Sequence, residues 1–108
     1  MAHDSRLSKI VIDAPPADHD RELAFWNAAT GQDIGLLIQR LDDGRARVHI
    51  DVHTDDVPAE VARLEKLGAE RAGQAHSWQL MRDPAGLVFC VIPERPGELN
   101  DSNARRWD

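Results

Sequence analysis

The sequence predicts an α+β fold built as one small domain, in which strands and helices alternate along the 108 residues. Two patterns carry this prediction. Apolar and polar residues alternate strictly over residues 48–53, as is typical of a strand with one buried face. Two other segments have apolar residues at helical spacing and end at a glycine, Gly31 or Gly68, the residue that often follows the last turn of a helix.

The first half of the chain predicts a strand, a helix and a second strand. Residues 7–12 form a short apolar run, and the two prolines that follow it end the strand and open a loop. Asp18 or Asp20 can cap the helix that follows, and Gly31 ends it. A strand is expected over residues 34–41, before a turn rich in aspartate and glycine.

The second half predicts a strand, a helix and three further strands. After the strand at residues 48–53, Asp55 or Asp56 caps the helix, and Gly68 ends it. The last three strands are expected over residues 69–73, 77–82 and 87–92, with a proline turn at 83–86 between the last two. This second half therefore forms a strand–helix–strand–strand–strand unit.

Composition and charge exclude several classes of partner. Hydrophobic residues make up 42% of the chain and charged residues 30%, an ordinary mixture for a globular protein. The formal net charge of -6 argues against a nucleic-acid partner, and no apolar run is long enough for a membrane span. Because Cys90 is the only cysteine and the N-terminus lacks a secretory signal, we expect a soluble cytoplasmic protein.

A set of short motifs occurs in a fixed order along most of residues 7–92. The motifs are Leu23-Ala24-Phe25-Trp26 before Gly31, then His49-Ile50-Asp51-Val52, Asp55-Asp56-Val57, Ala62-Arg63-Leu64, Leu67-Gly68-Ala69, Trp78, Asp83-Pro84-Ala85-Gly86 and Phe89-Cys90-Val91. Together they resemble the vicinal oxygen chelate superfamily, which includes glyoxalase-like and bleomycin-resistance-type domains.

The resemblance implies paired βαβββ modules that form a mostly antiparallel, cup-shaped sheet with helices on one face. Residues 47–92 correspond to a complete module. Only 16 residues separate Gly31 from Val48, so the first module, about residues 7–41, is shortened to βαβ. The shortening leaves a sheet edge unpaired, and we expect a second subunit of a homodimer to cover it.

The same resemblance implies domain limits and a ligand pocket. Residues 1–92 form one glyoxalase-like domain, and residues 93–108 form a polar, flexible tail. The family's metal ligands come from the first and last strands of each module, and they correspond here to Lys9, Gln39, His49 and Cys90. The expected pocket residues are Lys9, Gln39, His49, Asp51, Trp78 and Cys90.

Among the four ligand positions, His49 alone keeps a strong metal-binding residue type that matches the family. A protonated lysine cannot bind a metal, so we expect the Lys9 ammonium to take the place of the ion and to bind an anionic ligand. The domain would then bind a small, anionic metabolite without a metal site of the family type. A divalent metal held by His49 stays a candidate cofactor.

Other interpretations remain open at this point. One alternative is a metal-dependent lyase, isomerase or dioxygenase that uses His49, and another is a structural homodimer without catalysis. His49, Asp51 and His53 share one strand face, which also fits a row of solvated polar residues. His49 and His53 lie ~13 Å apart along a strand, too far to share one ion. Cys90 and Trp78 also fit a strand or core role, and the sequence does not identify the substrate.

Overall fold

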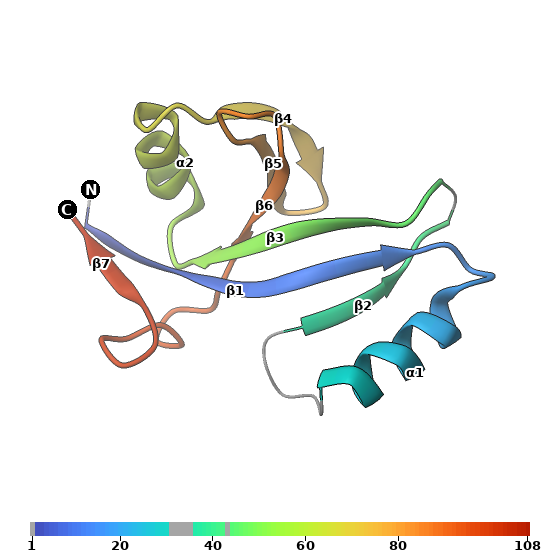
Figure 1. The fold of residues 1–108 in the computed structure, drawn as a ribbon. Helices are drawn as coiled ribbons and strands as arrows, with labels where there is room; N and C mark the ends of the chain where they lie inside the picture. Colours follow the sequence, from blue (N-terminus) through green and yellow to red (C-terminus); the bar gives the residue numbers. More distant parts are fainter. Residues whose placement is uncertain (1, 31–35, 43) are drawn as a thin grey trace. The chain divides into compact units, whose positions relative to one another are not determined.

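A computed structural model describes residues 2–30, 36–42 and 44–108. In these residues the chain forms seven strands and two helices (Figure 1), which follow one another as β1 (His3–Ala14), α1 (His19–Thr30), β2 (Leu36–Arg40), β3 (Arg47–Thr54), α2 (Val57–Lys66), β4 (Glu70–Ala75), β5 (Trp78–Arg82), β6 (Val88–Pro93) and β7 (Arg105–Trp107). The α+β class predicted from the sequence is confirmed.

The chain divides into two compact units. The first unit combines residues up to Ser8 with Ile50–Asp108, and the second unit is Lys9–His49. The strands β1 and β3 begin in one unit and end in the other, because each unit boundary falls within a strand. Each unit is described separately below.

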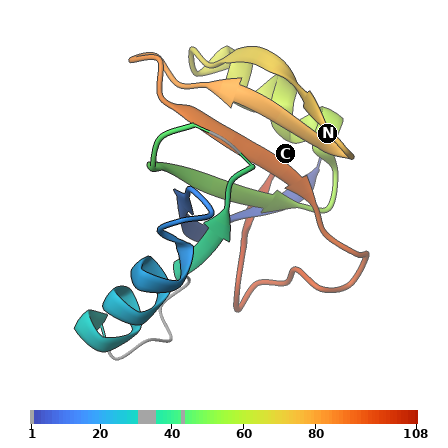
Figure 2. The same ribbon diagram turned by 90° about the vertical axis from the view of Figure 1, so that its right-hand side faces the viewer.

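In the first unit the strands follow the order β1, β3, β6, β5 and β4, and β7 pairs with β1. The β3–β6 pair is parallel, whereas β6–β5 and β5–β4 are antiparallel. The segment from β3 to β6, with α2 between β3 and β4, is therefore the complete βαβββ module that the sequence predicts. Helix α2 lies along one face of these strands (Figure 2).

Helix α2 begins and ends as local sequence signals predict. Asp56 is the N-cap, and its carboxylate accepts a hydrogen bond from the backbone nitrogen of Ala59 at 3.1 Å. After the helix, Gly68 has a φ of +110°, a conformation that side chains with a Cβ rarely adopt. A Cβ at this position would lie 3.4 Å from Cγ of Pro84, an ordinary contact, so the positive φ is what favours glycine here.

The core of the first unit lies between α2 and the strands. Val61 of α2 packs with Met81, Phe89 and Val91 of β5 and β6, and all four are buried. The register pairs Met81 with Phe89, so these core residues share one face of the strands. The opposite face carries the other set of alternating residues, which includes several predicted site residues.

In the second unit β1 and β2 form a parallel pair, with Ile10 opposite Leu36 and Ala14 opposite Arg40. Asp18, the residue before α1, accepts the first helical hydrogen bond from Glu22 at 2.9 Å through its backbone carbonyl. This βαβ order agrees with the shortened first module. Gly31 and the start of the predicted strand at residues 34–41 lie outside the described residues.

Strand β2 pairs only with β1 among the described strands. The homodimer expected to cover this edge therefore stays a prediction.

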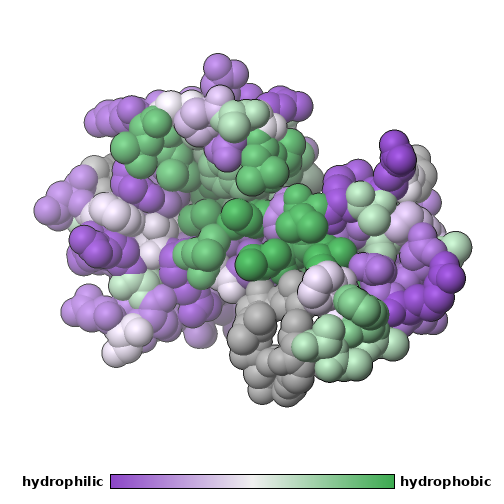
Figure 3. Space-filling model, viewed as in Figure 1, coloured by the Kyte–Doolittle hydropathy of each residue, from purple (hydrophilic) through white to green (hydrophobic). Residues whose placement is uncertain are grey.

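Surface residues over α1 differ along the helix, with hydrophilic residues over its first half and apolar residues over its second half (Figure 3). Neither described helix is long and apolar enough to cross a membrane.

The C-terminal segment, residues 93–108, was expected to be a polar, flexible tail, and its flexibility stays a prediction. It contains β7, which pairs antiparallel with the start of β1. Leu99 is buried, and Trp107 Nε1 donates a hydrogen bond to Ser5 Oγ at 2.9 Å. Leu99 and Trp107 are isolated apolar residues in this segment, and isolated residues produce no periodic pattern from which a strand can be predicted.

Candidate ligand-binding site

A buried histidine–carboxylate pair lies in the second unit. His49 Nδ1 of β3 is 2.8 Å from Asp13 Oδ2 of β1, and the Asp13 side chain is only 3% exposed. An ionised carboxylate only accepts hydrogen bonds, so Nδ1 is the protonated nitrogen in this pair. The bond holds the ring in one orientation and leaves Nε2 as the ring nitrogen with the lone pair.

Two more polar side chains belong to the surroundings of Asp13. Gln39 of β2 is its register partner in the parallel β1–β2 pair, and register partners lie on the same face. Arg47 Nε lies 3.7 Å from Asp13 Oδ2, and its side chain is mostly exposed. Asp13 Oδ1 is buried and has no hydrogen-bond partner among the described residues. The second unit therefore brings the predicted residues Gln39 and His49 together around Asp13.

Lys9 lies on the same face of β1 as Asp13, four residues earlier, and is half-buried. Four residues of strand span ~13 Å, so the two backbone positions are well separated. No described hydrogen bond or ion pair joins Lys9 to Asp13, Gln39 or His49. An ammonium at this position can reach a ligand only by extending its side chain along the strand.

The remaining predicted residues lie on one face of the first unit. Asp51 of β3 and Cys90 of β6 are register partners, and both are buried. Leu80 of β5 is the other register partner of Cys90, and Trp78 precedes it by two residues on the same strand face. This face is opposite the one that packs against α2. Trp78 is half-buried, and its ring contacts that of His76 edge to face.

Within the part of the chain that the structure describes, His49, Asp51 and Cys90 form a group whose side-chain types could hold a metal ion. Asp51 follows His49 by two residues on the same strand, so their side chains leave the same face. An imidazole, a carboxylate and a thiolate are common zinc ligands, so the donor chemistry fits a divalent transition metal. His53, the third residue of this row, contacts a different carboxylate, that of Glu94.

Asp13 is the residue that sequence reasoning missed. The two prolines after it suggested that the strand ends at residue 12, whereas β1 continues to Ala14. The alternation Lys9, Val11, Asp13 was the available signal, since it places the carboxylate on the face of a predicted site residue.

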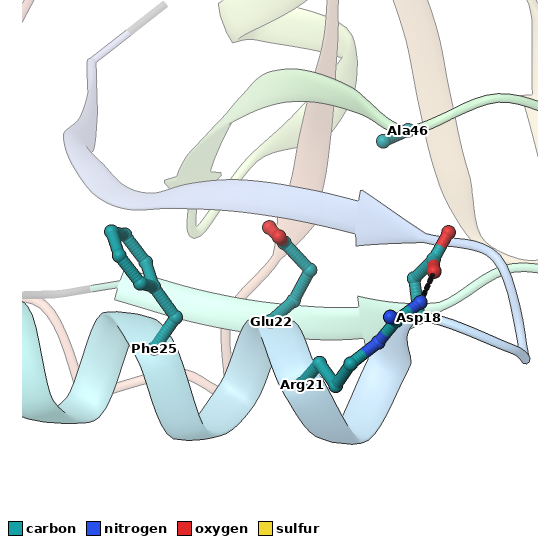
Figure 4. Close-up of a pocket in the computed structure, with 5 residues that line it drawn as sticks. All are labelled: Asp18, Arg21, Glu22, Phe25 and Ala46. Carbon is teal, nitrogen blue, oxygen red and sulfur yellow. Dashed lines mark hydrogen bonds and ion pairs between the residues drawn. The ribbon is translucent and has the colours of Figure 1, made fainter.

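A shallow pocket of about 430 Å³ lies elsewhere in the second unit, along α1. Figure 4 shows Glu22 and Phe25 projecting from the helix on the same side, with Asp18 paired to Arg21 and Ala46 opposite. None of the six predicted pocket residues lines this cavity. Trp26 Nε1 donates to Glu22 Oε2 at 3.2 Å, so the carboxylate already has a partner.

Comparison with known families agrees with the fold and the motif order. A family model described as a glyoxalase-like domain matches residues 9–92, which is most of the chain. The chain belongs to the glyoxalase-like domain family. This membership is consistent with the vicinal oxygen chelate superfamily that the motifs resemble. The sequence matches no curated protein, so the family is the level at which this glyoxalase-like domain is identified.

Proposed function

We propose that this glyoxalase-like domain binds a small anionic metabolite beside His49, with Nε2 of the imidazole accepting a hydrogen bond from the ligand. The observation that supports the proposal is the 2.8 Å bond between His49 and the buried Asp13. A ring held at Nδ1 keeps Nε2 in one position, so little conformational entropy is lost when a ligand binds.

The charges of the second unit favour an anion at this position. Lys9 and Arg47 contribute two cations, and Asp13 contributes one carboxylate. Gln39 adds an uncharged amide that can donate to a ligand oxygen or accept from a ligand hydroxyl. This set needs no metal to attract a carboxylate or phosphate group.

The first prediction concerns ligand affinity. We expect His49→Ala to weaken binding of a hit from a panel of small, hydroxyl-bearing carboxylates and phosphates by about 3- to 10-fold, the loss of one hydrogen bond accepted by Nε2. Asp13→Asn should weaken binding less, because the amide still accepts from Nδ1 without its charge. Binding is measured by thermal shift and then by calorimetry.

Arg40→Ala is the matched control for this experiment. Arg40 follows Gln39 on β2, is exposed, and projects to the other face, so the variant should bind like the wild type. A hit that binds His49→Ala and the wild type equally well would refute the proposal, and so would a panel without any hit.

The donor set favours a divalent metal ion as a second candidate ligand of the same strand face. His49, Asp51 and Cys90 would hold it, and Asp13 would orient the imidazole from behind, as carboxylates often do for metal-binding histidines. When bound, such an ion polarises an oxygen of a bound metabolite. Asp51 and Cys90 are already adjacent in the β3–β6 register, which supports this candidate.

The second prediction separates the two candidates. If the metal is the resident ligand, protein dialysed against zinc should retain about one ion per chain, and His49→Ala and Cys90→Ser should each lose it. His19→Ala, which removes a histidine outside the donor set, should retain the ion. Retention of zinc by His49→Ala would exclude the metal site, and absence of zinc from the wild type would leave the metal-free proposal.

A further inference from the structure

A second histidine–carboxylate pair lies wholly within the first unit. His53 Nδ1 of β3 is 3.1 Å from Oε1 of Glu94, the residue that directly follows β6. Arg6 of β1 donates from Nη2 to the same oxygen at 3.3 Å. The backbone nitrogen of Glu94 donates to Thr54 O at 2.7 Å, which fixes the carboxylate next to the end of β3.

The cluster is partly enclosed, and it contains more hydrogen-bond donors than its one carboxylate satisfies. The side chains of His53 and Glu94 are mostly buried, and that of Arg6 is 34% exposed. Oε1 of Glu94 is the hydrogen-bond partner of both Arg6 Nη2 and His53 Nδ1. Arg6 Nε is buried and has no hydrogen-bond partner among the described residues. The cluster thus contains donor groups that its own carboxylate does not satisfy.

A purely structural ion pair accounts for this geometry less well. A guanidinium that only ties strands together frequently meets its carboxylate with two parallel bonds, one to each oxygen. Here Arg6 donates one hydrogen bond to Glu94, through Nη2, so the other N–H groups of its guanidinium are not used by this carboxylate. His53 uses only Nδ1 in its bond to Glu94, and its Nε2 is on the opposite side of the ring.

We propose that Arg6 and His53 form a binding site for an oxyanion, the carboxylate or phosphate group of a small molecule, with Glu94 positioning the imidazole. Arg6 supplies the guanidinium edge that suits two anionic oxygens, and His53 donates from Nε2 when it is protonated. The guanidinium of Arg6 and the carboxylate of Glu94 balance each other's charge, and the buried Nε of Arg6 is the donor that a bound oxyanion would satisfy.

This site is separate from the one proposed at His49. It uses none of Asp13, Gln39 or His49, and all of its residues belong to the first unit. Loss of binding at one site can therefore be distinguished from loss at the other by the residue that is replaced.

The third prediction tests the cluster by NMR titration of the full chain with inorganic phosphate and, separately, with acetate. We expect saturable shifts of the Arg6 Nε and His53 ring resonances with at least one of the two anions. Arg6→Gln should weaken that binding by at least 10-fold, whereas Arg82→Gln, which removes an exposed arginine on β5, should not change it.

If Arg6→Gln does not fold, Arg6→Lys is the second variant. It keeps the positive charge but loses the planar guanidinium, and it should bind the anion at least several-fold more weakly than the wild type. Glu94→Gln should broaden or split the His53 ring resonances, because an amide can either accept from Nδ1 or donate to it and so no longer selects one tautomer. The inference is overturned if neither anion saturates, or if the folded arginine variant binds as well as the wild type.

Discussion

Replacement of Glu60 by glutamine should lower the free energy of unfolding by about 3–5 kcal/mol, the usual effect of removing one partner from a buried ionic cluster. The Glu60 side chain is 1% exposed. Its Oε1 lies 2.8 Å from His3 Nε2, and Arg63 donates to both carboxylate oxygens at 2.8 and 2.9 Å. The variant leaves the charge of Arg63 without its counterion in this enclosed position.

The expected loss is large because this carboxylate links three elements. His3 belongs to β1, Glu60 to α2, and the guanidinium of Arg63 lies 3.8 Å from the ring centre of Trp107 in β7. A change at Glu60 therefore weakens the attachment of both chain ends to the helix.

Urea denaturation followed by tryptophan fluorescence measures this effect. Glu65→Gln is the control, because Glu65 also pairs with an arginine, Arg71 at 3.1 Å, but lies at the surface. An exposed pair of this kind contributes about 0–1 kcal/mol. Equal losses in the two variants would show that the buried cluster has no special role.

The pH dependence of stability should report the same carboxylate. Burial raises the pKa of Glu60, but hydrogen bonds from Arg63, His3 and Ser5 outweigh it and hold the pKa below its ordinary value of 4.5. A depressed pKa stabilises the folded state above pH 4.5, and this contribution is lost as the pH falls through the folded-state pKa. The unfolding free energy of Glu60→Gln should therefore decline less than that of the wild type below pH 4.5.

Replacement of Met81 by alanine should cost about 2–5 kcal/mol of unfolding free energy, because it removes a fully buried side chain and leaves a cavity. Met81 is 0% exposed and packs with Val61, Phe89 and Val91 in the core of the first unit. The face of β5 that carries Met81 is the face that contacts α2, so the cavity would lie beneath the helix.

Arg82→Ala provides the comparison on the same strand. Arg82 follows Met81, is exposed, and should change the stability by less than about 0.5 kcal/mol. Chemical denaturation of both variants and of the wild type gives the two differences. A loss below 1 kcal/mol for Met81→Ala would contradict the position of this residue in a close-packed core.

The sequence alone determined the α+β class, the family and the order of elements from β1 to β6. These features depend on local chemistry, which a linear sequence records directly. Alternation over residues 48–53 predicts β3, the side chain of Asp56 caps α2 within its own first turn, and Gly68 ends that helix because its backbone takes a positive φ. The shortened first module also followed from the chain length before Val48.

The tertiary structure decided which side chains meet. His49 and Asp13 are 36 residues apart, and Glu60 and His3 are 57 apart, so no local pattern connects them. Strand register alone places Asp51 beside Cys90. The seven-stranded order, with β7 returning to β1, likewise depends on long-range pairing and on single anchors such as Trp107. Contacts of this kind form only when distant segments are brought together by folding, and for that reason the composition of the site could be predicted only in part from the sequence.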